Sequence, residues 1–311
     1  MTANAPDAKA PKGLGLTGFA SGDPVATGQA LTAEQGRAMG AVVELLSGHR
    51  LAVLTGAGLS TDSGIPDYRG PESVPRSPMT YQQFVGDELL RRRYWARNHV
   101  GWHHLRHADP NPGHLALATL EARGLLSGLI TQNVDRLHSA AGSAEVIDLH
   151  GTYDRVVCLQ CRTQYSRAEI AVLLEALNPG YLERESDAGD VAPDADADID
   201  DTGDFVMAPC PNCSGMLKPD FVYFGENVPK DRVAEAYQVV DAGDALLVAG
   251  SSLTVMSGLR FVRHASKAGK PVVIINRGKT RGDDLANLLV DIGVSEALTF
   301  LVESLPDLER R

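Results

Sequence analysis

The chain has 311 residues, an ordinary apolar content of 43% and a formal net charge of −11. This length allows one large domain with an insertion, or two domains, and an ample core. The negative charge argues against general binding to nucleic acid and against attraction to membrane surfaces, because both need basic patches. Ten carboxylates against one arginine lie between Glu183 and Asp204, so one acidic segment carries most of the excess.

Targeting signals are not evident. No apolar run reaches the ~18 residues of a membrane span, and the first residues lack the pattern of a secretory signal or a transit peptide. Four cysteines in two Cys-x-x-Cys pairs suit a reducing compartment better as metal ligands than as disulfides. We therefore expect a cytoplasmic protein that contacts neither nucleic acid nor membrane. Residues 1–30, rich in Ala, Gly and Pro, are expected to form a disordered tail.

The first predicted elements lead into a glycine-rich turn. A helix follows Thr32, a possible cap, and runs to about Ser47. The apolar run 51–54 is typical of a strand buried on both faces of a parallel sheet. Small residues then allow a sharp turn and close approach of a ligand: Gly56, Ala57 and Gly58. Such a turn holds the diphosphate of a dinucleotide in doubly wound folds.

The residues after this turn argue against hydride transfer. Ser60 and Thr61 could cap a helix whose free N–H groups face a diphosphate. Many α/β proteins, however, use a Gly-x-Gly turn merely to change direction. Thr61 also stands where the dehydrogenase fingerprint has a third glycine, and prolines fill the region where it expects a second strand and a ribose-binding carboxylate.

The segment from Gly56 to Arg69, Gly-Ala-Gly-Leu-Ser-Thr-Asp-Ser-Gly-Ile-Pro-Asp-Tyr-Arg, resembles the signature loop of the sirtuins, which are NAD-dependent protein-lysine deacylases. The resemblance extends from about Leu31 to Leu305. It implies that the loop contacts NAD through Gly56, Ala57, Gly58, Thr61, Asp67, Tyr68 and Arg69. Asp67 and Arg69 would order the loop around the cofactor.

Two further strand ends carry polar residues. The strand 128–131 is followed by Gln132, Asn133 and Asp135, whose side chains can bind ribose hydroxyls and a carboxamide. A helix-capping role could explain one of them but not all three. The block resembles the sirtuin Gln-Asn-x-Asp motif, although Arg136 replaces a residue that is usually small. The resemblance gives these residues NAD contacts, and gives Asn133 and Asp135 the task of positioning ribose, water and nicotinamide.

A predicted strand from Glu145 ends in His150, followed by Gly151. A lone histidine is more often structural than catalytic. Its place at a strand end and its similarity to the sirtuin His-Gly pair favour a catalytic base here. An ordinary histidine pKa near 6.5 would suit a base that works close to neutral pH.

Two cysteine pairs predict a closed, structural zinc site formed by Cys158, Cys161, Cys210 and Cys213. The gap between the pairs exceeds that of a compact zinc ribbon. It contains a predicted helix, 166–177, and the acidic tract 183–204. The tract lacks the glycine and final glutamate of a calcium loop, so we expect a solvated, mobile insert.

A helical pattern from Tyr81 to His104 carries Tyr94 and Arg97 on one face. Spacing alone favours a packed aromatic beside a solvated arginine. The segment resembles the class II branch of sirtuins, whose members resemble the mitochondrial ones. A Tyr-x-x-Arg pair in sirtuins that prefer carboxyl-acyl groups meets the acid end of the acyl chain. This resemblance implies a substrate contact by Tyr94 and Arg97 and a possible preference for succinyl or glutaryl groups.

The C-terminal half supplies more candidate contacts. The extended stretch 217–226 resembles the sirtuin segment that lines the acyl-lysine tunnel and pairs with the substrate peptide, which implicates Val222, Tyr223, Phe224 and Gly225. Without the resemblance, these aromatics could equally be core. Buried strands are predicted at 244–249 and 271–275. The resemblance assigns the adenosine half of NAD to the residues after them: Gly250, Ser251, Ser252, Asn276, Arg277, Gly278 and Val294.

These expectations combine into one fold. We predict an α/β doubly wound parallel sheet, Rossmann-like, formed by 31–152 and 215–311, with a helical cofactor-loop module at about 76–110. A small zinc-ribbon domain, 153–214, is inserted and contains the acidic insert.

The implied reaction consumes NAD and an acyl-lysine protein or peptide. The acyl oxygen attacks the ribose carbon as nicotinamide leaves, and His150 then deprotonates a ribose hydroxyl that attacks the acyl carbon. Lysine and O-acyl-ADP-ribose are released. Alternatives are a mono-ADP-ribosyltransferase or NAD glycohydrolase, and a zinc-ribbon binding module with a vestigial NAD fold. A dehydrogenase is least favoured.

Overall fold

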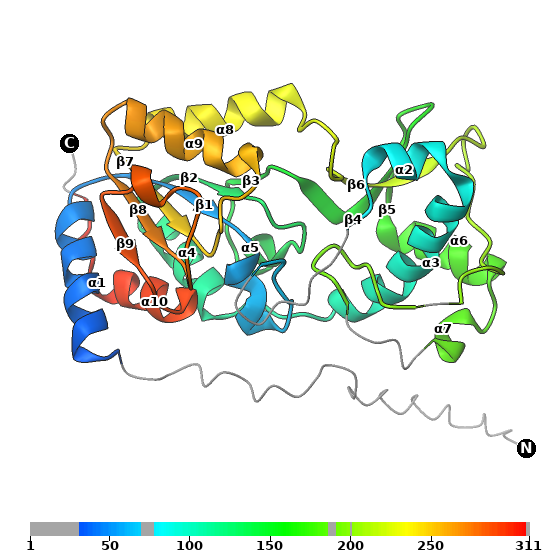
Figure 1. The fold of residues 1–311 in the computed structure, drawn as a ribbon, viewed down its shortest axis with the longest axis horizontal. Coiled ribbons are helices and arrows are strands. Elements are labelled where there is room, and N and C mark those ends of the chain that lie inside the picture. Colours follow the sequence, from blue (N-terminus) through cyan, green and yellow to red (C-terminus); the bar gives the residue numbers. More distant parts are fainter. Residues whose placement is uncertain (1–30, 70–77, 186–190, 200, 309–311) are drawn as a thin grey trace, which may run out of the picture.

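The computed structural model describes residues 31–69, 78–185, 191–199 and 201–308. The predicted tail, 1–30, lies outside these residues, as does most of the proline-rich loop after Arg69. The described chain forms a six-stranded sheet and a three-stranded sheet, which lie side by side in Figure 1.

The large sheet is parallel, with strand order β3-β2-β1-β7-β8-β9. Its strands are β1 (Leu51–Thr55), β2 (Leu126–Thr131), β3 (Val146–Asp148), β7 (Ala245–Ala249), β8 (Val272–Ile275) and β9 (Leu288–Val290). The chain order reverses between β1 and β7, which pair along their whole length. In an open α/β sheet the carboxyl ends of the strands at this reversal form the ligand crevice. The predicted doubly wound fold is confirmed.

Helices cover both faces of this sheet because its central strands alternate between two cores. Leu51 and Val53 face α1 (Ala33–Leu46), α4 (Pro112–Ala122) and α10 (Val294–Ser304). Ala52 and Leu54 face α8 (Lys230–Ala242) and α9 (Met256–Lys267). Figure 1 shows α8 and α9 above the sheet and α10 below it. Burial on both faces explains why the strands are continuous apolar runs.

The second sheet is antiparallel, with order β5-β4-β6. It comprises β4 (Gly151–Cys158), β5 (Gln164–Ser166) and β6 (Leu217–Phe221), so the chain leaves the small sheet only after Phe221. It shares one apolar core with α2 (Tyr81–Gly86), α3 (Glu88–Leu105) and α6 (Arg167–Leu177). The small sheet and the helical module are therefore a single packed unit. Short helices complete the chain: α5 (Leu137–Ala140), α7 (Tyr181–Arg184), and the 3₁₀ segments η1 (Ala57–Ser63) and η2 (Asp283–Leu285).

Two local expectations differ from the structure. The expected single helix 81–104 is two helices, because Asp87 ends α2 and caps α3 by accepting from Leu90 N at 3.0 Å. The segment after the glycine turn is a 3₁₀ helix that begins at Ala57 without a side-chain cap. Thr61 instead donates back to the Gly58 carbonyl at 3.1 Å, so neither Ser60 nor Thr61 caps this helix.

The central described part of the acidic tract, 191–199, is folded against the protein, contrary to the expected solvated insert. Val191 and Ala192 are buried, and three further buried apolar residues alternate with its carboxylates: Ala195, Ala197 and Ile199. Val191 and Ala197 form an antiparallel bridge that closes the segment on itself. Burial of these apolar side chains drives the segment onto the protein, while Asp198 stays exposed.

None of the described helices is long and apolar enough to cross a membrane.

Candidate active site

A cavity of about 540 Å³ opens at the reversal between β1 and β7 and continues toward the small sheet. Pockets of this size hold small-molecule ligands. Most of the predicted site residues line it: Gly56, Ala57, Gly58, Asp67, Tyr68, Arg69, Gln132, Asn133, Asp135, His150, Val222, Tyr223, Phe224, Gly225, Gly250, Ser251, Ser252, Asn276, Arg277 and Gly278. Four of the residues predicted to bind NAD or substrate are not part of the wall: Thr61, Tyr94, Arg97 and Val294.

Two glycine turns meet at the base of the cavity. Gly58 N donates to the Gly250 carbonyl at 2.9 Å. A Cβ at Gly250 would lie 2.4 Å from Leu59 N, and a Cβ at Gly56 would lie 2.8 Å from the Gly250 oxygen. Gly250 also has a φ of +66°. These glycines are therefore needed to pack the two turns against each other, in addition to giving a ligand access to the backbone.

His150 is held by both of its ring nitrogens. Nδ1 lies 2.9 Å from the Gln132 carbonyl, which can only accept, so this nitrogen carries the proton. Nε2 lies 2.8 Å from Ser257 Oγ and is left as the acceptor. The contact with Gln132 therefore sets the tautomer, and Nε2 keeps the lone pair that can accept a proton.

The pKa of His150 is lower than the ordinary value near 6.5 that we expected. Burial lowers the pKa of His150 from 6.5 to about 4, and the nearby Arg232 and Arg260 act in the same direction, against the opposing hydrogen bond to Gln132. The imidazole is consequently neutral at pH 7. It can act as a base without first losing a proton.

Asp135 and Asn133 are joined through a serine that the motif did not single out. Ser60 Oγ donates to Asp135 Oδ2 at 2.6 Å and accepts from Asn133 Nδ2 at 3.0 Å. Asn133 Nδ2 also reaches the Gly56 carbonyl at 3.1 Å. Burial raises the pKa of Asp135, while its hydrogen bonds from Ser60 and Leu137 N oppose that shift. The sequence indicated Ser60 only as a possible helix cap, because the partners that give it this role lie more than 70 residues away.

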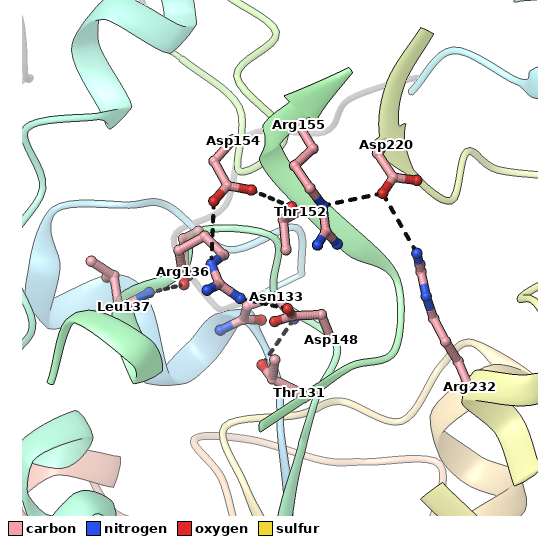
Figure 2. A network of polar contacts seen from close by, with 11 residues as sticks. Thr131, Asn133, Arg136, Leu137, Asp148, Thr152, Asp154, Arg155, Asp220 and Arg232 are labelled. Carbon is pink, nitrogen blue, oxygen red and sulfur yellow. Dashed lines mark hydrogen bonds and ion pairs between the residues drawn. The ribbon is translucent and has the colours of Figure 1, made fainter. Parts of the chain in front are cut away.

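Figure 2 shows how Arg136 anchors this block to both sheets. Its guanidinium lies 2.6 Å from Asp148, at the end of β3, and 3.4 Å from Asp154, on β4. Arg136 has a φ of +63°, a left-handed conformation that residues other than glycine seldom adopt. The ion pairs give the arginine a structural role at this position.

The 221–226 segment joins His150 to the small sheet. Val222 N donates to the His150 carbonyl at 2.7 Å. The buried Lys218 donates to the Phe221 carbonyl and to Glu226, whose carboxylate also accepts from Tyr223 N at 2.9 Å. On its other side Phe224 forms a parallel bridge with Thr80. These bonds hold the predicted peptide-binding segment against the cavity.

The four cysteines are placed to bind zinc. The Cys158 and Cys213 sulfurs lie 3.5 Å apart, and those of Cys161 and Cys210 lie 3.7 Å apart. All four ligand atoms lie within 4.8 Å of one another. A tetrahedron with Zn–S bonds of about 2.3 Å has edges of about 3.8 Å, so the cluster fits the ion. It lies in the small domain, apart from the cavity residues, and is structural.

A second group, His99, His103 and Glu175, also brings three ligand atoms within 4.8 Å. Burial lowers the pKa of both histidines, and the positive charge of Arg167 adds to the shift. That buried guanidinium would equally repel a metal ion.

The chain is similar in sequence to known proteins of one family. The Sir2 family pattern matches residues 56–257, well over half of the chain. NAD-dependent protein deacetylase 1 of Mycobacterium avium (strain 104) is 61% identical over 269 residues, which cover 86% of this chain and 95% of that protein. The chain belongs to the Sir2 family. NAD-dependent protein deacetylase 1 of Streptomyces coelicolor is 52% identical over 268 residues, covering 85% of this chain and 89% of the relative.

Solved Sir2 structures share the fold of this sirtuin. One, described as Sir2 with a p53 peptide and NAD⁺, has a TM-score of 0.68 and 32% identity, and covers 85% of this chain and 97% of that chain. Another, described as a Sir2 variant with deacetylated p53 peptide and 3′-O-acetyl ADP-ribose, has a TM-score of 0.69 and 31% identity. It covers 86% of this chain and 99% of that chain.

Proposed function

We propose that this sirtuin is an NAD-dependent protein-lysine deacylase that transfers the acyl group of an acyl-lysine to ADP-ribose and releases nicotinamide. The observation that carries the proposal is His150. Its Nε2 is a proton acceptor within the cavity that also contains both glycine turns and the 221–226 segment. The relatives named as deacetylases support the same activity.

NAD would lie across the glycine turns. The absence of side chains at Gly56, Gly58 and Gly250 would let the diphosphate approach the backbone closely, and Ser251, Asn276 and Arg277 offer polar contacts to the adenosine half. NAD supplies the electrophilic ribose carbon and the nicotinamide leaving group.

Each polar residue then has one task. Asn133 and Asp135, fixed by Ser60, would orient the nicotinamide ribose. His150 Nε2 would accept the proton of a ribose hydroxyl, and Ser257 would keep the ring aligned before substrate arrives. No protein nucleophile is required.

The acyl-lysine would enter beside Val222 and Phe224, where a peptide can add backbone hydrogen bonds to an extended segment. The alternative preference for acidic acyl groups is not favoured, because Arg97 is already paired with Asp196 at 2.7 Å. We also propose a cytoplasmic location, since four zinc-binding thiolates need a reducing compartment.

The test is incubation of an acetyl-lysine peptide with and without NAD, followed by mass spectrometry of peptide, nicotinamide and O-acetyl-ADP-ribose. We expect deacetylation only with NAD, and its loss by at least about a hundredfold in His150→Ala, which removes the base. His264→Ala is the matched control, because this exposed histidine pairs with Asp241 between α9 and α8 and does not line the cavity. Nicotinamide release without loss of the acetyl group would instead support a glycohydrolase or an ADP-ribosyltransferase.

A further inference from the structure

The folded acidic segment 191–199, here called the insert, reaches the cavity. Pro193 and Asp194 form part of the wall, together with the apolar residues Ile65, Val134 and Phe221. Burial raises the pKa of Tyr223, and the negative charge of Asp194 adds to that shift, so the carboxylate lies close to the segment expected to hold the acyl-lysine. The insert therefore shapes the same part of the cavity.

Two ion pairs of Arg97 hold the insert on α3. Arg97 Nε lies 2.7 Å from Asp196 Oδ1, and Nη2 lies 3.7 Å from Asp198. The Asp196 side chain is 23% exposed, whereas that of Asp198 is 70% exposed. The shorter contact is thus the shielded one, in which an ion pair is least weakened by solvent.

Hydrogen bonds to backbone carbonyls also join the insert to α3. Asn98 Nδ2 donates to the Asp194 carbonyl at 3.4 Å, and Ala197 N donates to the Arg97 carbonyl at 3.4 Å. Gly101 lies directly beneath the insert, where a Cβ would meet the Ala195 oxygen at 2.2 Å. This glycine sits inside a helix, where alanine is intrinsically preferred. Its lack of a side chain lets the insert approach α3 closely.

We propose that the insert is a wall that selects the acyl group by limiting its length, and that Arg97 is the positioning residue that holds it there. This inference rests on the proposed deacylase function. Arg97 then acts on acyl choice through Asp196 and not by binding the acyl chain. A short acyl group fits beside Pro193 and Asp194, while a long one must displace them.

The test compares kcat/KM for one peptide carrying acetyl, butyryl, hexanoyl, decanoyl or succinyl groups. In Arg97→Met the insert loses its clamp, and in Gly101→Ala the new methyl group pushes against Ala195. We expect both variants to raise the decanoyl-to-acetyl ratio by about tenfold or more, the effect of roughly one methylene of fit in an apolar pocket. Asp196→Asn should shift the ratio in the same direction.

The matched control is Arg184→Met, because Arg184 pairs with Asp204 of the same acidic tract but does not line the cavity. Its acyl profile should equal that of the wild type. The exchange Arg97→Asp with Asp196→Arg should restore the wild-type ratio, which general damage to α3 would not do. If Arg97→Met fails to fold, Gly101→Ala alone decides the matter.

Two results would overturn the proposal. One is an unchanged acyl ratio in both Arg97→Met and Gly101→Ala. The other is a selective loss of succinyl activity in Arg97→Met but not in Asp196→Asn, which would mean that Arg97 binds the acyl chain directly. The wild-type rate on acetyl-lysine reports separately on the proposed function, because it does not depend on the ratio between acyl groups.

Discussion

Replacing His99 by phenylalanine should make the protein less sensitive to acid. His99 is fully buried on α3, and among the described residues neither of its ring nitrogens has a hydrogen-bond partner. Burial, aided by the charges of Arg167 and His103, lowers its pKa from 6.5 to about 3. The folded state therefore holds His99 neutral down to a pH at which the unfolded chain has already protonated it.

The sign and size of the effect follow from linkage. A histidine whose pKa is lowered by folding contributes stability above pH 6.5 that is lost as the pH falls. At pH 5 the unfolded histidine is almost fully protonated and the folded one is neutral, which favours unfolding by about 2 kcal/mol. At pH 7.5 the same difference is below about 0.1 kcal/mol. Phenylalanine removes this penalty altogether.

The assay is urea unfolding of the wild type and of His99→Phe at pH 7.5 and pH 5. The variant should gain about 2 kcal/mol relative to the wild type between these two values. Protonation shared by both proteins, including that of the zinc thiolates, cancels in this comparison. Phe205, whose ring centroid lies 6.0 Å from that of His99, provides the control, since Phe205→Leu should have the same effect at both pH values. Equal acid sensitivity of His99→Phe and the wild type would refute the reasoning.

Three further predictions address the site and its supports. Ser60→Ala removes the donor to Asp135 at 2.6 Å, so kcat should fall by about tenfold or more, as steady-state rates would show. Calorimetry should also show a lower melting temperature, because leaving the buried carboxylate without this partner costs about 1–3 kcal/mol. Gly151→Ala places a Cβ 2.0 Å from the Asp220 carbonyl at a φ of +79°, and should cost more than about 3 kcal/mol in chemical denaturation; a smaller loss would contradict the geometry. We expect atomic emission to find one zinc per chain in the wild type and none in Cys158→Ser, which should also have a lower melting temperature. Full zinc content in the variant would argue against the four-cysteine site.

Much of the fold could be predicted because the central strands carry strong signals. The runs at 51–54, 245–249 and 272–275 are apolar throughout, and each lies in a strand buried on both faces. Strands of three residues, such as β5 and β9, are too short for a pattern to emerge. The site was accessible through short motifs at strand ends, which the parallel sheet gathers at one edge.

The site features that the sequence did not indicate depend on contacts between distant segments. Ser257 meets His150 across 107 residues, and no local pattern distinguishes it from other serines. The fate of the acidic tract was visible in principle, since Ala195, Ala197 and Ile199 follow the period of two of a half-buried segment. We expected a solvated segment because the tract is rich in aspartate. The low pKa of His150 reflects burial in the assembled cavity, which composition does not reveal.

The ion pairs of Arg136 have a consequence for how the enzyme would fail when zinc is scarce. The loop with Asn133 and Asp135 is tied through Asp154 to β4, whose last residue is the zinc ligand Cys158. A chain deprived of metal would keep its Rossmann half but lose the outer support of the loop that orients the ribose. Loss of zinc would thus weaken NAD binding, at a site distant from the ion, before the protein unfolds globally.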